Sequence, residues 1–342
     1  MPRDLPLVCI CIPTYNAAAT IKETLVSILA QAYKNIVIHV SDNASSDATL
    51  MIVESLADHR VKIHRNAENI GGEENFNRCI QLAEGKYTAI FHADDIYEQD
   101  MVAKQVAFFE AHPEAGAVFT DARTIDEMGK EISKTCIPNY IKSLGGLYNF
   151  RTMFKALLMY SNFFICPSVM VRTRIYKQEI KCFLGGQYKT SADLDVWLRI
   201  MQHHPVGYLK EPLMRYRISS SQGSAKVRLG TKRADFFLVM DHYLEQEFVQ
   251  SFITASDISN YENLERRDQV MRAVNLYITG YSRQASELIK DVLFLGAIKS
   301  ALKSKQGVFV LILGSYLKLL VLLRLNKIGK LSLMYMKNVT SR

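Results

Sequence analysis

Short apolar runs recur along the first 120 residues, separated by stretches with helical spacing. The runs are rich in β-branched residues and lie at 7–12, 36–40, 61–64, 87–91 and 117–120. Their hydrophobicity is continuous and does not alternate with polar residues, which is typical of strands covered on both faces, as in a parallel sheet. The pattern therefore predicts a mostly parallel central sheet.

The stretches between these runs carry helix signals. Helices are expected at 20–31, where Thr20 and Glu23 have the spacing of a capping box, and at 47–56, 73–82 and 100–111. Strand and helix thus alternate as in βαβ units, with helices on both faces of the sheet. Such units place the loops that follow the strands along one edge of the sheet, where open α/β folds bind ligands.

Beyond residue 122 this alternation weakens. A loop-like stretch at 126–146 precedes an expected helix at 147–160, an expected strand at 164–171 and a short helix from Asp193. From about residue 231 the spacing is helical, with helices expected at 236–248, 264–278 and 284–302. We therefore divide the chain into an α/β domain at 1–225, a helical region at 226–305 and an apolar, basic tail at 306–342.

Composition and charge narrow the class of protein. The chain has 342 residues, of which 49% are apolar and 22% charged, which excludes a mainly disordered protein. Its six cysteines include no C-x-x-C pair, so neither a zinc module nor a disulfide framework is indicated, and a reducing compartment fits best. The net charge of +8 resides at the C-terminal end, because 292–342 holds nine basic residues and no Asp or Glu.

The basic tail surrounds the most apolar run of the chain, at 307–325. A nucleic-acid arm has no need of such a run, so an anionic membrane surface is the better partner and no nucleic acid is expected. The run is long enough to cross a bilayer, but Lys318 lies near its middle, which favours a helix lying in the membrane interface. A buried helix, or one that forms a homo-oligomer, is the alternative. No export signal is visible before residue 7, so we expect a cytoplasmic protein, peripheral at the inner face of the membrane.

Polar residues follow three of the expected strands, at positions where an apolar sheet does not require them. The three groups are Pro13-Thr14-Tyr15-Asn16, the run from Ser41 to Asp47, and His92-Ala93-Asp94-Asp95. If the strands are parallel, Thr14, Asp42, Asp94 and Asp95 share one cleft. A carboxylate such as Asp42 can accept the N3–H of uracil, whereas adjacent carboxylates need a cation, for which oxygen ligands suit Mg²⁺ or Mn²⁺.

Each group also has a plain structural interpretation. Asp47 has the position of an N-cap for the next helix, and the other two groups are compatible with solvated turns. Only their occurrence together, in order, at the ends of the first, second and fourth expected strands favours a binding site. No G-x-G-x-x-G follows the first strand and no P-loop motif occurs, so a dinucleotide or P-loop fold is disfavoured.

Residues 7 to about 220 resemble glycosyltransferase family 2, whose members are inverting, nucleotide-sugar-dependent enzymes with the A-type glycosyltransferase fold. The resemblance is carried by four ordered segments: 8–16, 41–47, 69–77 with Asn69 and Asn77, and 84–95. It implies that Pro13, Thr14, Asn16, Asp42, Asn69 and Asp94 bind the nucleotide sugar. It also implies that Asp94 and Asp95 hold the Mn²⁺ or Mg²⁺ that bridges the donor diphosphate.

The segment from Ser191 to Arg199 resembles the acceptor side of that family, and Asp193 takes the place of the catalytic base. An inverting transfer is a single in-line displacement at the sugar C1, so it needs one base on the acceptor hydroxyl. The alternative for Asp193 is an N-cap, and Asp195 is the second candidate for the base. Arg217, before the run at 219–221, resembles the closing loop and is expected to meet the diphosphate.

Three residues depart from the family's pattern. His92 and Ala192 stand where acids are frequent, and Ser219 stands where a histidine is frequent. At the first of these positions either the metal rests on Asp94 and Asp95 alone, or His92 is itself a ligand. The resemblance implies a metal-dependent hexosyltransferase that moves a sugar from a UDP-linked donor to a saccharide acceptor, expected to be lipid-linked, in surface-polysaccharide synthesis. Because of these three departures, the alternative function is that of a non-catalytic nucleotide-sugar-binding or scaffold protein on the same fold. The donor sugar, the acceptor and its linkage have no readable signal.

Overall fold

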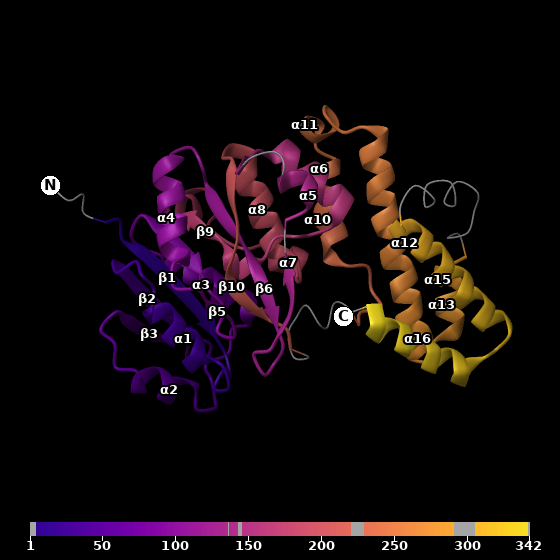
Figure 1. The fold of residues 1–342 in the computed structure, drawn as a ribbon, viewed down its shortest axis with the longest axis horizontal. Helices are drawn as coiled ribbons and strands as arrows, with labels where there is room; N and C mark the ends of the chain where they lie inside the picture. Colours follow the sequence, from indigo (N-terminus) through magenta and orange to yellow (C-terminus); the bar gives the residue numbers. More distant parts are fainter. Residues whose placement is uncertain (1–4, 136, 143–145, 220–228, 291–304, 341–342) are drawn as a thin grey trace. The chain divides into compact units, whose positions relative to one another are not determined.

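The computed structural model describes residues 5–135, 137–142, 146–219, 229–290 and 305–340. The chain divides into two compact units, one formed by 1–154 with 162–219 and the other by 155–161 with 220–342. The first is an α/β unit and the second is helical (Figure 1). The finer division of the chain at residues 225 and 305 stays a prediction.

The α/β unit is built on one sheet, which has ten strands within the described ranges. The strands are β1 (Val8–Thr14), β2 (Ile36–Asp42), β3 (Val61–Arg65), β4 (Tyr87–Ile90), β5 (Ile96–Tyr97), β6 (Ala117–Ile125), β7 (Glu131–Thr135), β8 (Leu147–Tyr148), β9 (Met170–Arg172) and β10 (Val206–Arg217). Their order is β3-β2-β1-β4-β9-β6-β10-β5, with β7 beside β6 and β8 beside β10.

The main strands run in one direction. β1 pairs in parallel with β2 and β4, β2 with β3, and β6 with β10, while β9 runs antiparallel between β4 and β6. The carboxyl ends of β1, β2, β4, β6 and β10 therefore meet at one edge of the sheet. The register places Thr14 opposite Asp42 and Asp42 opposite Arg65 at that edge.

Helices cover both faces of the sheet (Figure 1). They are α1 (Ile21–Leu29), α2 (Thr49–Ser55), α3 (Gly72–Leu82), α4 (Met101–Ala111), α5 (Asn139–Lys142), α6 (Phe150–Tyr160), α7 (Gly185–Tyr188) and α8 (Ala192–His203), with a 3₁₀ turn η1 (Cys166–Ser168) and a π-helical turn η2 (Ile175–Ile180). The even-numbered residues of β1, such as Ile10, face the core formed with α1, α2 and α4, whereas Cys11 contacts α3 through the carbonyl of Cys79. The expected α/β class and the helical C-terminal region are confirmed.

Three local expectations were wrong. The stretch at 126–146 is not simply a loop, because it contains β7, which forms a hairpin with β6, and the short α5. Thr20 forms no capping box: its hydroxyl donates to the carbonyl oxygen of Ala93, and Glu23 instead accepts from Arg217. β10 was not predicted, because Pro212 and the charged residues Lys210 and Glu211 interrupt its apolar pattern.

The helical unit contains α10 (Asp235–Leu244), α11 (Glu247–Gln250), α12 (Ala255–Ile278), α13 (Ser282–Leu288), α15 (Lys305–Leu322) and α16 (Asn326–Thr340). α12 begins with a capping box between Thr254 and Asp257. The expected helix at 284–302 overlaps α13, and its part at 291–302 lies outside the described residues.

The apolar run at 307–325 forms most of α15 and packs one of its faces into the helical unit. Val310, Leu313, Leu317 and Leu320 belong to a core with residues of α12 and α13. Gly329 of α16 lies against α12, where a Cβ atom would meet the Tyr277 hydroxyl at 2.8 Å. Within the described ranges, no helix combines the length and the hydrophobicity that a membrane span requires.

Candidate functional site

The ends of β1 and β2 form one side of the site. Thr14 and Asp42 are register partners and both are buried. One carboxylate oxygen of Asp42, Oδ2, accepts a hydrogen bond of 3.1 Å from the backbone N–H of Ser45. The other, Oδ1, has no hydrogen-bond partner among the described residues. A buried carboxylate oxygen without a partner is costly to the fold, so it is a natural place for a ligand donor.

The loop after β1 is fixed to the loop after β2. Asn16 has a φ of 47°, in the left-handed region that asparagine tolerates. Its backbone N–H donates to the Ser45 hydroxyl at 2.9 Å, and its side-chain oxygen accepts from the N–H of Ser46 at 2.9 Å. Asp47 accepts from the N–H of Thr49, at the start of α2, and from that of Ala18. Asp47 therefore supports the first turn of α2 and also joins the two loops.

A third loop joins this side through side-chain amides. The side-chain oxygen of Asn69 accepts from Asn43 Nδ2 at 2.8 Å and from the N–H of Gly71 at 2.9 Å. Asn43 follows Asp42 directly, and its own oxygen accepts from the side chain of Asn66. The sequence analysis identified Asn69 but missed Asn43 and Asn66. The position of Asn43, directly after the Asp42 strand end, was the available signal.

The acidic pair follows β4. His92, Asp94 and Asp95 each offer one ligand atom, and these three atoms lie within 4.8 Å of one another. The Asp95 side chain is fully buried: Oδ1 accepts from the backbone N–H of Arg217 at 2.8 Å, and Oδ2 has no partner among the described residues. Burial raises the pKa of Asp95 well above its usual range, and the negative charge of Asp94 raises it further.

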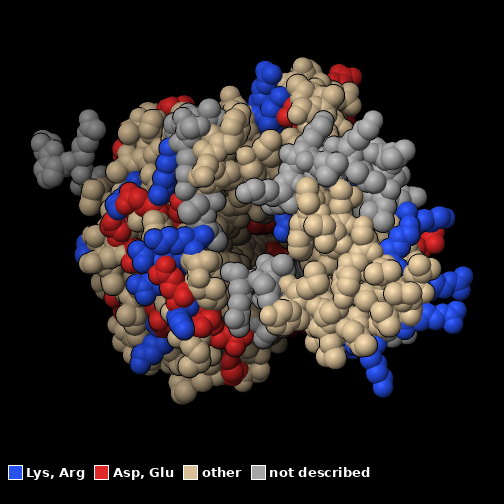
Figure 2. Space-filling model, turned by 45° about the vertical axis from the view of Figure 1, so that its right-hand side comes forward, with Lys and Arg blue, Asp and Glu red and all other residues tan. Residues whose placement is uncertain are grey.

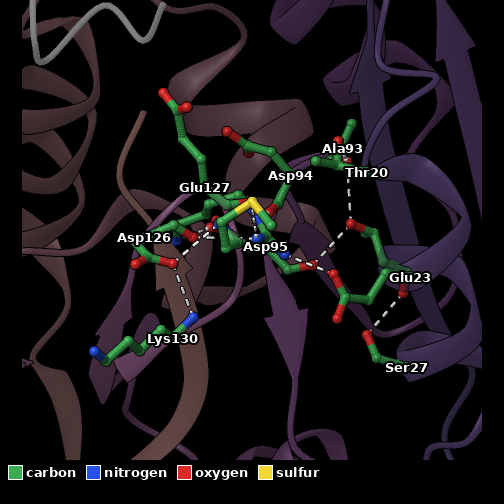
Figure 3. A network of polar contacts seen from close by, with 12 residues as sticks. Thr20, Glu23, Ser27, Ala93, Asp94, Asp95, Asp126, Glu127 and Lys130 are labelled. Atoms are coloured by element: carbon green, nitrogen blue, oxygen red, sulfur yellow. Dashed lines mark hydrogen bonds and ion pairs between the residues drawn. The ribbon is translucent and has the colours of Figure 1, made fainter. Parts of the chain in front are cut away.

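Arg217, at the end of β10, connects the acidic pair to the rest of the sheet edge. Its guanidinium donates to the carbonyl oxygens of Asp94 at 2.8 Å, Asp126 at 3.2 Å and Glu127 at 3.1 Å, and to a Glu23 carboxylate oxygen at 2.6 Å. Figure 3 shows this network, with the side chains of Asp94 and Glu127 projecting to the same side of it. The guanidinium is therefore engaged by the protein itself, and its expected contact with a diphosphate stays a prediction.

Asp193 lies in the first turn of α8, and the N-cap of that helix is Ser191. Burial raises the pKa of the Asp193 carboxyl to about 6, although the nearby backbone N–H of Leu194 acts in the opposite direction. Asp193 is half-buried, whereas Asp195 is buried. The Asp195 carboxylate accepts from Arg199 Nε at 2.8 Å, and that guanidinium is fixed by two backbone carbonyls. The N-cap alternative for Asp193 is thus wrong, and the two carboxyls of the segment have different surroundings.

Cys166 connects this segment to the acidic pair. Desolvation raises the pKa of its thiol well above the usual range, and the charges of Asp193 and Asp95 raise it further. Both carboxyls therefore act on this half-buried side chain. The sequence analysis missed Cys166, since nothing in its surrounding sequence marks it.

These residues can bind a charged ligand and move a proton. The unpartnered oxygen of Asp95 and the atoms grouped with it fit a divalent cation, because buried carboxylates of this kind favour a hard ion. A carboxyl with a pKa of about 6 can act as a general base near neutral pH.

Comparisons with known proteins address the family and the fold. The model of "Glycosyl transferase family 2" matches residues 9–179, half of the chain. The chain is 26% identical over 273 residues to "Putative glycosyltransferase EpsE" of Bacillus subtilis, covering 75% of this chain and 93% of the relative. It is 34% identical over 106 residues to "UDP-Glc:alpha-D-GlcNAc-diphosphoundecaprenol beta-1,3-glucosyltransferase WfaP" of Escherichia coli, covering 31% of this chain and 42% of the relative.

Among solved structures, the chain resembles S. aureus TarS 1-349 in complex with UDP-GlcNAc, with a TM-score of 0.59 and 15% identity. The likeness covers 96% of this chain and 89% of the other. At that identity it shows a shared fold, and the expected A-type glycosyltransferase fold is confirmed.

Proposed function

The chain belongs to glycosyltransferase family 2, and from this premise we propose that it is an inverting hexosyltransferase that uses a UDP-linked donor. It transfers the sugar to a hydroxyl of a lipid-linked saccharide during cell-surface polysaccharide synthesis. The observation that carries the proposal is the half-buried Asp193 side chain, whose carboxyl has a pKa of about 6. Asp195, two residues further on, is neutralised by Arg199.

Asp193 is the base of the proposed reaction. It accepts the proton of the acceptor hydroxyl as that oxygen attacks C1 of the donor sugar, on the side opposite the leaving diphosphate. Burial favours this role, because a base with a pKa near the working pH is both deprotonated and able to take a proton. A carboxylate with an ordinary pKa near 4 would be a weaker acceptor of that proton.

The loops after β1, β2 and β3 hold the nucleotide. Asp42 Oδ1 accepts the N3–H of a uracil ring, which satisfies the oxygen that lacks a partner. Asn16 and Asn69 hold the three loops together through the contacts described above, and Pro13 and Thr14 line the same strand end. UDP-linked donors appear in the names of WfaP and of the TarS complex, which supports uridine over guanosine.

Asp94 and Asp95 would hold the divalent cation, Mn²⁺ or Mg²⁺. When bound, such an ion stabilises the charge that develops on the leaving diphosphate. The protein's own part is to keep both carboxylates in place. Arg217 does so through the Asp94 carbonyl and the Asp95 carboxylate, and Thr24 donates to the Asp95 carbonyl at 2.8 Å.

The helical unit offers a surface for a lipid-linked acceptor. On α15 and α16 the side chains of Ile312, Leu322, Ile328, Leu331 and Tyr335 are all at least 60% exposed. Among the residues of this region whose exposure is described, the exposed basic ones are Lys318, Arg324, Lys327 and Lys330. In Figure 2 this unit presents a broad surface without charged side chains, and Lys and Arg side chains stand along its edge. Such a face suits peripheral binding to an anionic membrane at the cytoplasmic side.

The test is a donor screen. The purified chain is incubated with UDP-, GDP- and dTDP-sugars, with and without Mn²⁺ or Mg²⁺, and the release of nucleoside diphosphate is measured. We expect metal-dependent release from one UDP-sugar. Asp95→Asn should abolish it while keeping the Oδ1 contact with Arg217. Asp100→Asn, a change of the same kind at a surface ion pair with Lys104, should leave it unchanged.

Other outcomes have defined meanings. Binding of UDP by calorimetry without release from any donor, even with undecaprenyl-diphosphate-linked sugars present, would favour a non-catalytic nucleotide-sugar-binding or scaffold protein. Absence of both release and binding would refute the nucleotide-sugar proposal.

A further inference from the structure

His92 contributes the nitrogen to the cluster at the end of β4. Within the described residues, His92, Asp94 and Asp95 form the group of three or more His, Cys, Asp or Glu that could share an ion. Two ligands on opposite sides of an ion with bonds of about 2.1 Å lie about 4.2 Å apart. The spread of the three ligand atoms, within 4.8 Å, is therefore close to that of a coordination sphere.

The imidazole is held in place, but one of its nitrogens has no partner among the described residues. The ring packs edge-on against Phe76 with centroids 5.6 Å apart, and the backbone N–H of His92 donates to the Tyr97 hydroxyl at 2.7 Å. Nε2 is buried and has no partner among the described residues. Nδ1 is 3.8 Å from Asp95 Oδ2, too far for a hydrogen bond.

A purely structural histidine would satisfy its buried nitrogen, because unpaired buried polar atoms are rare in native proteins. The Oδ2 atom of the fully buried Asp95 lies 3.8 Å from His92 Nδ1 in this cluster, and it has no partner among the described residues. An ion bound by this oxygen and by an imidazole nitrogen would remove the penalty on Asp95. A water molecule could bridge them as well, and the test below separates these cases.

We infer that His92 is the third protein ligand of the cation site, and that its nitrogen shifts the site away from Mg²⁺ toward first-row transition ions. The inference rests on the proposed function for the role of the cation and adds a ligand that sets which ion is used. All-oxygen sites suit Mg²⁺, Ca²⁺ and Mn²⁺, whereas an imidazole in the set favours Fe²⁺, Co²⁺ and Ni²⁺. His92→Asp would restore an all-oxygen set.

The test uses the full chain with metal alone and then with metal plus UDP. Mn²⁺ is the spectroscopic probe, because electron spin echo modulation detects a nitrogen bonded to the ion. We expect nitrogen modulation in the wild-type protein and in His59→Asp, a surface histidine whose side chain is 93% exposed. In His92→Asp, Mn²⁺ should still bind and the nitrogen modulation should be lost.

Ion preference is the second measurement. The ratio of Co²⁺ to Mg²⁺ affinity, measured by calorimetry, should fall by about tenfold or more in His92→Asp and stay unchanged in His59→Asp. His92→Asn, which keeps the size and neutrality of the residue, should weaken binding of Co²⁺ more than of Mg²⁺. Circular dichroism checks that each variant is folded.

The wild-type spectrum alone can overturn the inference. Bound Mn²⁺ without nitrogen modulation, or no bound Mn²⁺ with or without UDP, would show that His92 is not a ligand. Failure of the proposed function looks different. A protein that shows nitrogen-ligated Mn²⁺ but releases nucleotide from no donor would keep the ligand assignment and lose the glycosyltransferase proposal. Turnover by a protein whose bound Mn²⁺ shows no nitrogen modulation would refute the ligand assignment and keep the glycosyltransferase proposal.

Discussion

The α/β unit and the helical unit differ in how they depart from the usual burial pattern. Among the described residues, nine buried polar atoms of the α/β unit have no hydrogen-bond partner, including Asp42 Oδ1, Asp95 Oδ2 and His92 Nε2, whereas the helical unit has one, the Tyr277 hydroxyl. The helical unit exposes large apolar side chains on two neighbouring helices, including Leu322 at 77% and Leu331 at 70%.

Both departures cost stability in the isolated protein, and they point to different ligands. A buried polar atom without a partner favours a small polar or charged ligand that supplies the missing contact. An exposed apolar face edged by lysines favours a large surface with apolar and anionic groups. Under the proposed function, the α/β unit recognises the donor and the helical unit attaches to the membrane. Each prediction below tests one side of that assignment.

The largest effect is expected from Asp193→Asn. Loss of the base should lower kcat by about 10²–10⁴-fold while UDP affinity stays within twofold, because in the proposed reaction Asp193 acts on the acceptor and not on the nucleotide. Steady-state turnover and calorimetry with UDP give the two values. Asp195→Asn is the matched variant: it breaks the contact with Arg199, so it should lower the melting temperature. A fully active Asp193→Asn protein would move the base to Asp195 or elsewhere.

Arg217→Gln should have the next largest effect, on stability. The side chain is buried and its guanidinium donates to three backbone carbonyls and to Glu23, so its loss should lower the free energy of unfolding by about 3 kcal/mol. Urea unfolding measures this. If Arg217 serves mainly the diphosphate, as its motif position implies, stability will change little and UDP affinity will fall instead.

The sequence predicted the α/β half well because β1, β2 and β4 are almost fully buried and polar residues come close to their ends. The run from Val8 to Ile12 has no polar position, Asp42 is the last residue of β2, and Asp94 lies four residues after β4, so parallel pairing was enough to bring them to one edge. The prediction of β10 failed because charged residues and Pro212 interrupt its apolar pattern, and register shifts occur at that point.

Contacts between distant segments could not be predicted. Glu23 was interpreted as part of a capping box, whereas its partner is Arg217, 194 residues away. Cys166 and Asp193 are likewise brought together only by the tertiary fold. In the tail, the composition of 307–325 predicted an apolar helix, but which side of it would be buried depends on α12 and α13.

The pH dependence of turnover gives a smaller but specific effect. With the pKa of Asp193 raised to about 6, the base is deprotonated above that pH and becomes protonated below it. At saturating metal and donor, kcat should therefore be constant near pH 7.5 and about tenfold lower at pH 5. The residual activity of Asp193→Asn should lack this acid limb. An inflection near pH 4 in the wild type would contradict a desolvated base.

The smallest effects are expected on the helical side. Lys327→Gln should weaken binding to vesicles of phosphatidylglycerol and phosphatidylcholine by about fivefold at low salt, since each basic residue near an anionic surface contributes about 1 kcal/mol. Leu331→Gln should weaken vesicle binding by a similar factor that persists at high salt, because apolar insertion is not screened.

Neither change should alter turnover with a soluble acceptor. Lys22→Gln, at an exposed position of α1, is the matched control and should leave vesicle binding unchanged. If both tail variants bind vesicles as the wild type does, the exposed apolar face has another occupant, and the assignment of membrane attachment to the helical unit fails while the donor site is unaffected.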